Sequence, residues 1–204
     1  MVSTDVVVYR PTFGRVLFGC VTVLAVGGLI AGLVQNFDAA LVTIAPIALV
    51  VLFVWAAYWR PAVVVSPGGV ELCNVTRTIE LPWPSIQRID TKYALTLVTA
   101  YGEYASWAAP APGRRAHLMK SDPEATKNLP KSTINAGTVG SGDLGNTSSG
   151  QAAFLIRHRW EELRDAGLLK DAKLERNRPV VRWHTATLIA MGMLLGASIV
   201  GFAV

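Results

Sequence analysis

The chain has 204 residues, of which 51% are hydrophobic and only 16% are charged, against roughly 25% charged in an average soluble domain. Such a deficit argues against a wholly soluble protein and is expected where part of the surface faces lipid. The formal net charge is +5, and 17 of the 19 Lys and Arg lie between Arg60 and Arg182. The two cysteines, Cys20 and Cys73, are too few to build a disulfide framework.

Three long apolar segments carry no Asp, Glu, Lys or Arg: residues 16–34, 39–59 and 183–204. At about 1.5 Å per residue, each is long enough to cross a hydrocarbon core of about 30 Å. The alternatives are buried core helices for all three segments and a signal peptide for the first one. Core helices rarely run this far without a charge, so the segments are predicted to be transmembrane helices.

The first two segments are separated by only four residues, 35–38, so they are predicted to form an antiparallel helical hairpin. Gly28 and Gly32 are spaced by four residues, which suits close packing between helices in a membrane. Pro46 lies in the middle of the second segment and predicts a kink there.

The flanking charges predict how the helices are oriented. Arg10 and Arg15 precede the first segment, Arg60 follows the second, and the hairpin turn carries only Asp38. By the positive-inside rule, the N-terminus and residues 60–182 are expected in the cytoplasm and the C-terminus outside a multi-pass protein of the cell membrane. The aromatic residues Trp55, Trp59 and Trp183 then fall at the cytoplasmic membrane interface.

The stretch after Arg60 has the pattern of a β-rich domain. Short alternating runs separated by turn residues predict six strands, at residues 62–65, 70–75, 78–81, 86–90, 94–98 and 103–107. Strands at this spacing are typical of an antiparallel sheet that curls into a small barrel or a sandwich.

The composition then becomes polar between residues 120 and 150, which favours a flexible linker or a long loop. After it, Ala153, Ile156, Trp160 and Leu163 recur at helical spacing, and Gly167 is predicted to end the helix. Its apolar stripe is expected to pack on the β domain, with the membrane surface as the alternative. The other faces carry charged side chains, among them Arg157 and Arg159.

These patterns divide the chain into five parts. They are an N-terminal transmembrane hairpin (1–60), a β domain (61–119), a linker (120–150), an amphipathic helix with a basic segment (151–181) and a C-terminal transmembrane helix (182–204). The expected fold class is therefore membrane α + β.

The runs RPAVVVSPGGVELCNVTRTIELPWPSIQRI and KYALTLVTAYGEYASWAAPAPGR, together with RWEELRDAGLL, resemble bacterial pleckstrin-homology-like (PH-like) domains of actinobacterial membrane proteins. The resemblance implies a bent, seven-stranded antiparallel PH-like barrel closed by a C-terminal helix, often beside a transmembrane hairpin. Eukaryotic relatives hold phosphoinositides through a basic cluster in the first strand–strand loop. Here that loop is Ser66-Pro67-Gly68-Gly69, which contains no cation.

No pattern of an enzyme, a metal site or a cofactor site stands out. The histidines His117, His158 and His184 are far apart and none has metal-ligand spacing. No Gly-rich phosphate loop joins a strand to a helix. No ionisable Asp, Glu, Lys or Arg interrupts the apolar segments, so a proton or ion path is not expected. We therefore expect a non-enzymatic protein without a cofactor or a small-molecule substrate.

Two functions remain. The first is a membrane-anchored module that binds protein, as an accessory or assembly subunit of a larger actinobacterial membrane complex, for example a respiratory-chain assembly. The alternative is an inner-leaflet sensor or scaffold for anionic lipid. Nucleic acid is not an expected partner, because the cations are scattered among 12 acidic residues. The candidate lipid contacts at the membrane surface are Arg60, Arg114, Arg115, Lys170, Lys173, Arg176, Arg178 and Arg182.

Overall fold

A computed structural model describes residues 5–111, 134–135, 138–139, 147–167, 169 and 178–203. It divides into two compact units. A β-rich unit is formed by residues 1–10, 62–74 and 78–182, and a helical unit by residues 11–61, 75–77 and 183–204.

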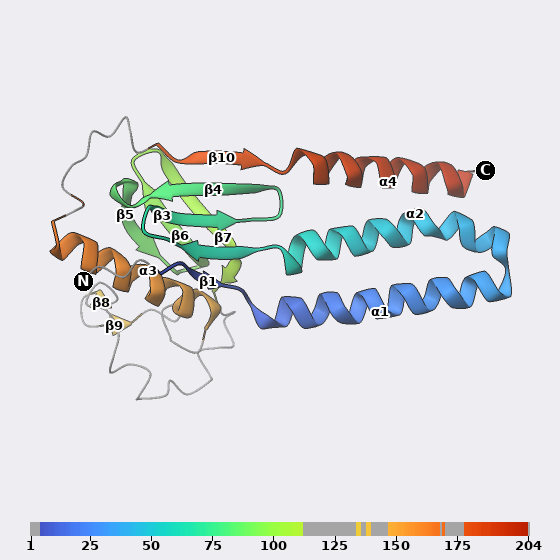
Figure 1. Ribbon diagram of the computed structural model, residues 1–204, viewed down its shortest axis with the longest axis horizontal. Coiled ribbons are helices and arrows are strands. Elements are labelled where there is room, and N and C mark those ends of the chain that lie inside the picture. The colour runs from blue at the N-terminus through green and yellow to red at the C-terminus, as the bar shows by residue number, and fades with distance from the viewer. Residues whose placement is uncertain are drawn as a thin grey trace. The chain divides into compact units, whose positions relative to one another are not determined.

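The helical unit contains three helices that are long and apolar enough to cross a membrane, as predicted. They are α1 (Thr12–Gln35), α2 (Phe37–Val54) with its continuation η1 (Trp55–Trp59), and α4 (Thr185–Ala203). Figure 1 shows α2 between α1 and α4, and α2 contacts both of them. The helices α1 and α2 each begin a few residues before the apolar segments that predicted them.

A single residue, Asn36, separates α1 from α2. Its backbone N–H donates to the Gly32 carbonyl at 2.9 Å, which ends α1, and its side-chain oxygen accepts from the Ala39 N–H at 3.1 Å, which caps α2. The predicted antiparallel hairpin is therefore present, with a tighter turn than the four residues expected. Pro46 lies inside α2 without ending it.

The larger sheet of the β-rich unit has the strand order β1-β2-β3-β4-β10. Its strands are β1 (Val7–Tyr9), β2 (Ala62–Val65), β3 (Gly69–Cys73), β4 (Arg77–Pro82) and β10 (Val180–Trp183). The β1–β2, β2–β3 and β3–β4 pairs are antiparallel. Alternation along β2, β3 and β4 sends one row of apolar side chains inward, as the period of two requires: Val63, Val65, Val70, Leu72, Ile79 and Leu81.

The smaller sheet has the order β5-β6-β7 and is antiparallel throughout. It consists of β5 (Ile86–Asp90), β6 (Ala94–Thr99) and β7 (Gly102–Pro110). The six predicted strands thus correspond to β2 to β7. A further short pair, β8 (Ile134–Asn135) and β9 (Thr138–Val139), forms a two-stranded antiparallel sheet.

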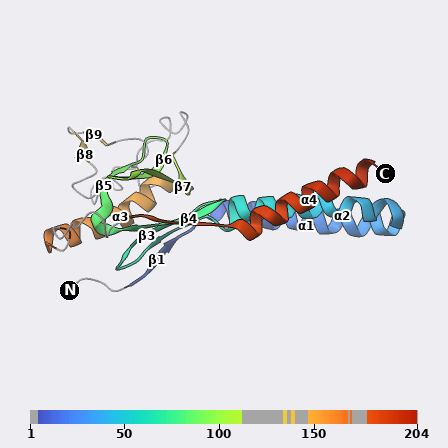
Figure 2. The same ribbon diagram turned by 90° about the horizontal axis from the view of Figure 1, so that it is seen from above.

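The helix α3 (Ser148–Asp165) packs on the sheets through the predicted apolar stripe. Ala153 and Ile156 are fully buried, Leu163 is buried and Trp160 lies half-buried against the core. Figure 2 shows α3 between the two sheets, and it contacts β2, β6 and β7. The Thr147 hydroxyl caps the helix by accepting from the Gly150 N–H at 3.0 Å, and Gly167 follows the helix end with a φ of +74°.

The expected closed barrel is not what the described residues form: they form separate antiparallel sheets. Two features of the chain explain the opening. Pro82 ends β4 and Pro84 lies within the turn η2 (Trp83–Ser85) between β4 and β5, and proline has no N–H to donate to a neighbouring strand. In addition, β10 occupies the edge of β4 and β1 occupies the edge of β2. Neither β1 nor β10 was predicted; residue 183 was expected to begin a helix.

Two charged residues of α3 differ from expectation. Arg157 and Arg159 were predicted on faces other than the apolar stripe, yet they expose only 5% and 8% of their surface. The reason is that each finds a polar partner at the edge of the core. Arg157 donates to the Ile89 carbonyl at 3.2 Å, and Arg159 pairs with Glu162 at 3.2 Å. Most of the predicted 120–150 linker lies outside the described residues, and α3 already begins at Ser148.

Candidate interaction sites

Three arginine–tryptophan pairs lie at one end of the helical unit, where α1 begins, α2 ends and α4 begins. In each pair the guanidinium carbon stands over an indole ring. The distances to the ring centroid are 5.2 Å for Arg15 over Trp59, 5.4 Å for Arg60 over Trp55 and 5.4 Å for Arg77 over Trp183. These six residues, called the Arg–Trp belt below, have the geometry of cation–π pairs. Amphipathic rings paired with cations are suited to a membrane–water interface.

The local backbone explains how Trp55 and Trp59 reach this position. The residues Trp55–Trp59 form one π-helical turn, closed by the hydrogen bond from the Arg60 N–H to the Trp55 carbonyl at 3.0 Å. Such turns insert one extra residue and often mark functional positions. Trp59 also packs against Phe18 of α1, with ring centroids 5.3 Å apart. The turn thus attaches the end of α2 to the start of α1.

His184 lies at the start of α4 within the same end of the helical unit. Its backbone N–H donates to the Thr76 carbonyl at 2.9 Å, and its Nδ1 lies 3.4 Å from the Val75 carbonyl oxygen. Burial lowers the pKa of His184 below 6.5, the positive charge of Arg60 lowers it further, and the contact with Val75 opposes both effects. A neutral ring fits this position beside Arg60, whose guanidinium also donates to the Thr187 hydroxyl at 3.0 Å.

The Ser66–Gly69 loop of the β-rich unit is held in a tight turn. The Ser66 N–H donates to the Gly69 carbonyl at 2.9 Å, the Ser66 hydroxyl donates to the same carbonyl, and the Trp83 indole donates to the Ser66 carbonyl at 2.9 Å. A cavity of about 260 Å³ beside the loop is lined in part by Glu71, Glu80 and Val180.

The carboxylates of this cavity determine its charge. Glu71 and Glu80 are directly opposite one another in the β3–β4 register. Arg182 of β10 pairs with Glu80 at 2.8 Å. Two acids and one cation leave the cavity unsuited to a phosphate group. Among the described residues that line this cavity, none is a cation that could bind a phosphate group beside the Ser66–Gly69 loop.

The structure distributes the predicted surface cations over both units. Arg60 belongs to the Arg–Trp belt, Arg182 pairs with Glu80, and Arg178 stands 5.7 Å from the Tyr101 ring centroid. The other predicted lipid contacts, Arg114, Arg115, Lys170, Lys173 and Arg176, lie outside the described residues.

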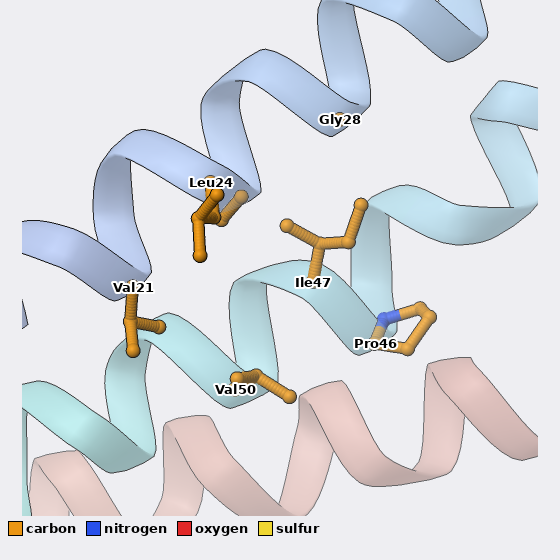
Figure 3. Close-up of a pocket in the computed structure, with 7 residues that line it drawn as sticks. Val21, Leu24, Gly28, Pro46, Ile47 and Val50 are labelled. Carbon is orange, nitrogen blue, oxygen red and sulfur yellow. The ribbon is translucent and has the colours of Figure 1, made fainter.

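The predicted helix-packing glycines take different positions. A Cβ added at Gly32 would contact the Ala40 side chain at 3.6 Å, so this residue faces α2 of the same chain. A Cβ at Gly28 would meet no atom within 4 Å. Gly28 instead lines an apolar groove between α1 and α2 (Figure 3).

Sequence reasoning included Trp55, Trp59, Arg60 and Trp183 among the candidates but missed Arg15 and Arg77 as their partners. Arg15 flanks the first apolar segment, and this position was the available signal. No sequence signal pointed to Arg77, because its partner Trp183 is more than a hundred residues away in the chain. Among the residues that the structure describes, no group of three His, Cys, Asp or Glu side chains is placed to hold a metal ion.

Residues 60–120 match the family described as Bacterial PH domain, a range that contains β2 to β7. No curated protein and no solved structure matches the chain. PH domains act as non-catalytic modules that bind lipid or protein. The chain thus carries a bacterial PH domain at residues 60–120, in a protein whose three apolar helices are long enough to cross a membrane.

Proposed function

We propose that this protein is a membrane-anchored interaction module, in which three transmembrane helices hold a PH domain at the cytoplasmic face of the cell membrane. The observation that carries the proposal is the way the chain connects the helices to the strands of the PH domain. Only two residues separate β1 from α1, two separate η1 from β2, and one separates β10 from α4. A domain built on these strands stays next to the bilayer once the helices are inserted.

The orientation of the anchor is supported by its charges. The helical unit has three arginines, all in the Arg–Trp belt, and its one acidic residue, Asp38, lies in the first turn of α2 at the opposite end. The positive-inside rule therefore puts the belt, the N-terminus and residues 60–182 on the cytoplasmic side and the C-terminus outside.

Protein is the partner that we propose for the PH domain. The Ser66–Gly69 loop has no cation, and Glu71 and Glu80 line the neighbouring cavity, so a phosphorylated headgroup would meet negative charge there. By contrast, Trp107 on β7 exposes 58% of its surface, and exposed aromatic residues are enriched at protein interfaces. The proposed role is an accessory or assembly subunit of a larger membrane complex.

A direct test combines purification with site-specific cross-linking. The tagged protein is extracted from its native membrane in a mild detergent, and co-purifying proteins are identified by mass spectrometry. A photo-reactive amino acid at Trp107 is then compared with the same probe at Gln87, an exposed residue of β5. A stoichiometric membrane protein cross-linked only from position 107 supports the proposal. Recovery of the protein without any protein partner contradicts it.

The second candidate function is an inner-leaflet scaffold or sensor for anionic lipid, and the Arg–Trp belt is the observation that favours it. Each cation near an anionic membrane surface contributes about 1 kcal/mol to binding. The same purification separates the two functions, because recovery with lipid alone moves this candidate to first place.

A further inference from the structure

The helices α1 and α2 touch near both of their ends and separate between them. Near the belt end, Gly14 lies directly against the Tyr58 carbonyl group, and at the hairpin end a Cβ on Gly32 would contact Ala40 at 3.6 Å. Between these contacts, the small side chain of Ala25 and the lack of a side chain at Gly28 leave the space between the helices unfilled. The result is a groove with a volume of about 440 Å³.

The walls of the groove are almost entirely apolar. They come from Val21, Leu24, Ala25 and Gly28 of α1 and from Pro46, Ile47 and Val50 of α2. Figure 3 shows Leu24 and Ile47 projecting into the space between the two ribbons. An occupant of this groove therefore has to be apolar.

The position of the groove along α1 relates it to the Arg–Trp belt. On α1 the groove extends from Val21, six residues after Arg15, to Gly28, thirteen residues after Arg15. At about 1.5 Å per residue these positions are about 9 and 20 Å from Arg15. One leaflet contributes about 15 Å of hydrocarbon, half of a core of about 30 Å, so the groove begins at the depth of the inner part of an acyl chain and reaches the middle of the bilayer.

The charge above the groove is uniformly positive. Arg15 and Arg60 stand on the two tryptophans of the π-helical turn, and Arg77 is the third cation at this end. The helical unit has no carboxylate at this end, because Asp38 is at the other. Arg15 is exposed, so its guanidinium can pair with a phosphate.

We propose that the helical unit holds one anionic phospholipid of the cytoplasmic leaflet, with its phosphate at Arg15 and Arg60 and one acyl chain in the groove between α1 and α2. The proposal rests on the proposed insertion of the three helices in the membrane. It assigns the groove to lipid and not to a partner helix, because Gly32, the second residue of the Gly28–Gly32 pair, already faces Ala40 of the same chain.

The full-length protein in lipid nanodiscs provides the test. The nanodiscs contain equal amounts of phosphatidylglycerol and phosphatidylcholine with the same acyl chains, and native mass spectrometry counts the lipids that stay bound. Gly28→Leu fills the groove, and Arg15→Gln removes a cation from the headgroup site. Gly19→Leu is the matched control, because a Cβ at Gly19 also meets no atom within 4 Å but Gly19 does not line the groove.

We expect the wild type and Gly19→Leu to retain one phosphatidylglycerol that Gly28→Leu does not retain. Arg15→Gln is expected to lower the preference for phosphatidylglycerol about fivefold, the equivalent of about 1 kcal/mol for one cation. Equal lipid retention by all variants overturns the proposal. The proposal is also overturned if Gly28→Leu causes the loss of a co-purifying membrane protein and not of lipid. If the wild type fails to resist carbonate extraction from membranes, the membrane anchor itself is refuted. If it resists extraction and the variants do not differ, only the lipid site is refuted.

Discussion

Gly14 of α1 lies against the backbone carbonyl of Tyr58, so closely that an added Cβ would collide with the Tyr58 oxygen. The obstacle is backbone and not the end of a flexible side chain, so the helices themselves would have to move apart. Gly14→Ala is therefore expected to destabilise the helical unit by about 1–3 kcal/mol, the typical cost of forcing an extra carbon into a packed site. This loss would outweigh the higher helix propensity of alanine.

Gly19→Ala is the matched control for that substitution, because it makes the same change in α1 at a position with open space. Thermal unfolding in a mild detergent measures both variants. We expect a lower melting temperature for Gly14→Ala only. Equal melting temperatures would show that α1 and the end of α2 are not in close contact.

The β3–β4 hairpin depends on Gly69 in a similar way. Gly69 is opposite Pro82 in the register, and a Cβ there would collide with the Leu81 carbonyl oxygen. Gly69→Ala is expected to destabilise the PH domain by about 1–3 kcal/mol. Gly68→Ala, one residue earlier, meets only the Ser66 hydroxyl at 4.0 Å and is expected to be neutral. Hydrogen exchange of the β3 and β4 amides compares the two variants. A similar increase of the exchange rate in both would contradict the close approach of Gly69 to the Leu81 carbonyl.

Two side chains of α3 satisfy backbone carbonyls of β5, at the edge of the smaller sheet. Arg157 donates to the Ile89 carbonyl at 3.2 Å and Trp160 to the Ile86 carbonyl at 3.3 Å. Arg157→Met removes a donor to a part-buried carbonyl, at an expected cost of about 1–3 kcal/mol, and Trp160→Phe costs about 1 kcal/mol. Both variants should speed hydrogen exchange of β5. Arg88→Met, whose side chain on β5 is 66% exposed, is the control that should not.

Local sequence patterns predicted most of the fold, because most of its helices and strands are marked by residues that are close together in the chain. The helices come from uncharged runs, and β2 to β7 come from alternating residues between turn signals. The strands β1 and β10 were missed because three or four residues carry no periodicity, and the apolar residues Val180 and Val181 merge with the span that follows them. Their pairing with β2 and β4 joins residues far apart in the chain, which no local pattern records.

The candidate sites were predictable to a smaller extent, for a related reason. Trp55, Trp59 and Arg60 were identified because their place beside an apolar segment already implies an interface. Their partner Arg15 and the groove at Gly28 depend on how two helices pack. The burial of Arg157 shows the limit of charge as a guide, because a long side chain can cover apolar surface while its polar end reaches a carbonyl.

The Arg182–Glu80 ion pair is expected to offset repulsion between two acids. Glu71 and Glu80 are cross-strand neighbours, and like charges in that arrangement are destabilising. The pair is partly exposed, so Arg182→Gln should cost only about 0.2–1 kcal/mol. Adding Glu80→Gln should restore the stability, since it removes the repulsion as well. Chemical denaturation at low and high salt measures the cycle, and additive effects of the two substitutions would exclude the coupling.

His184 should make the stability of the helical unit depend on pH in one direction. Its pKa in the folded protein is lowered below 6.5, chiefly by burial and then by Arg60, so between these two values the unfolded state binds more protons than the folded state. Stability then rises with pH in this window, is complete above about pH 6.5, and is lost as the pH falls toward the folded pKa. Thermal unfolding in detergent between about pH 5 and 8 measures the slope. His184→Gln, which keeps a polar side chain without the titration, is expected to flatten the curve below pH 6.5, and Arg60→Gln to reduce its slope. A wild-type curve that is level through this range, or one that rises toward low pH, would mean that the ring is not held neutral beside Arg60.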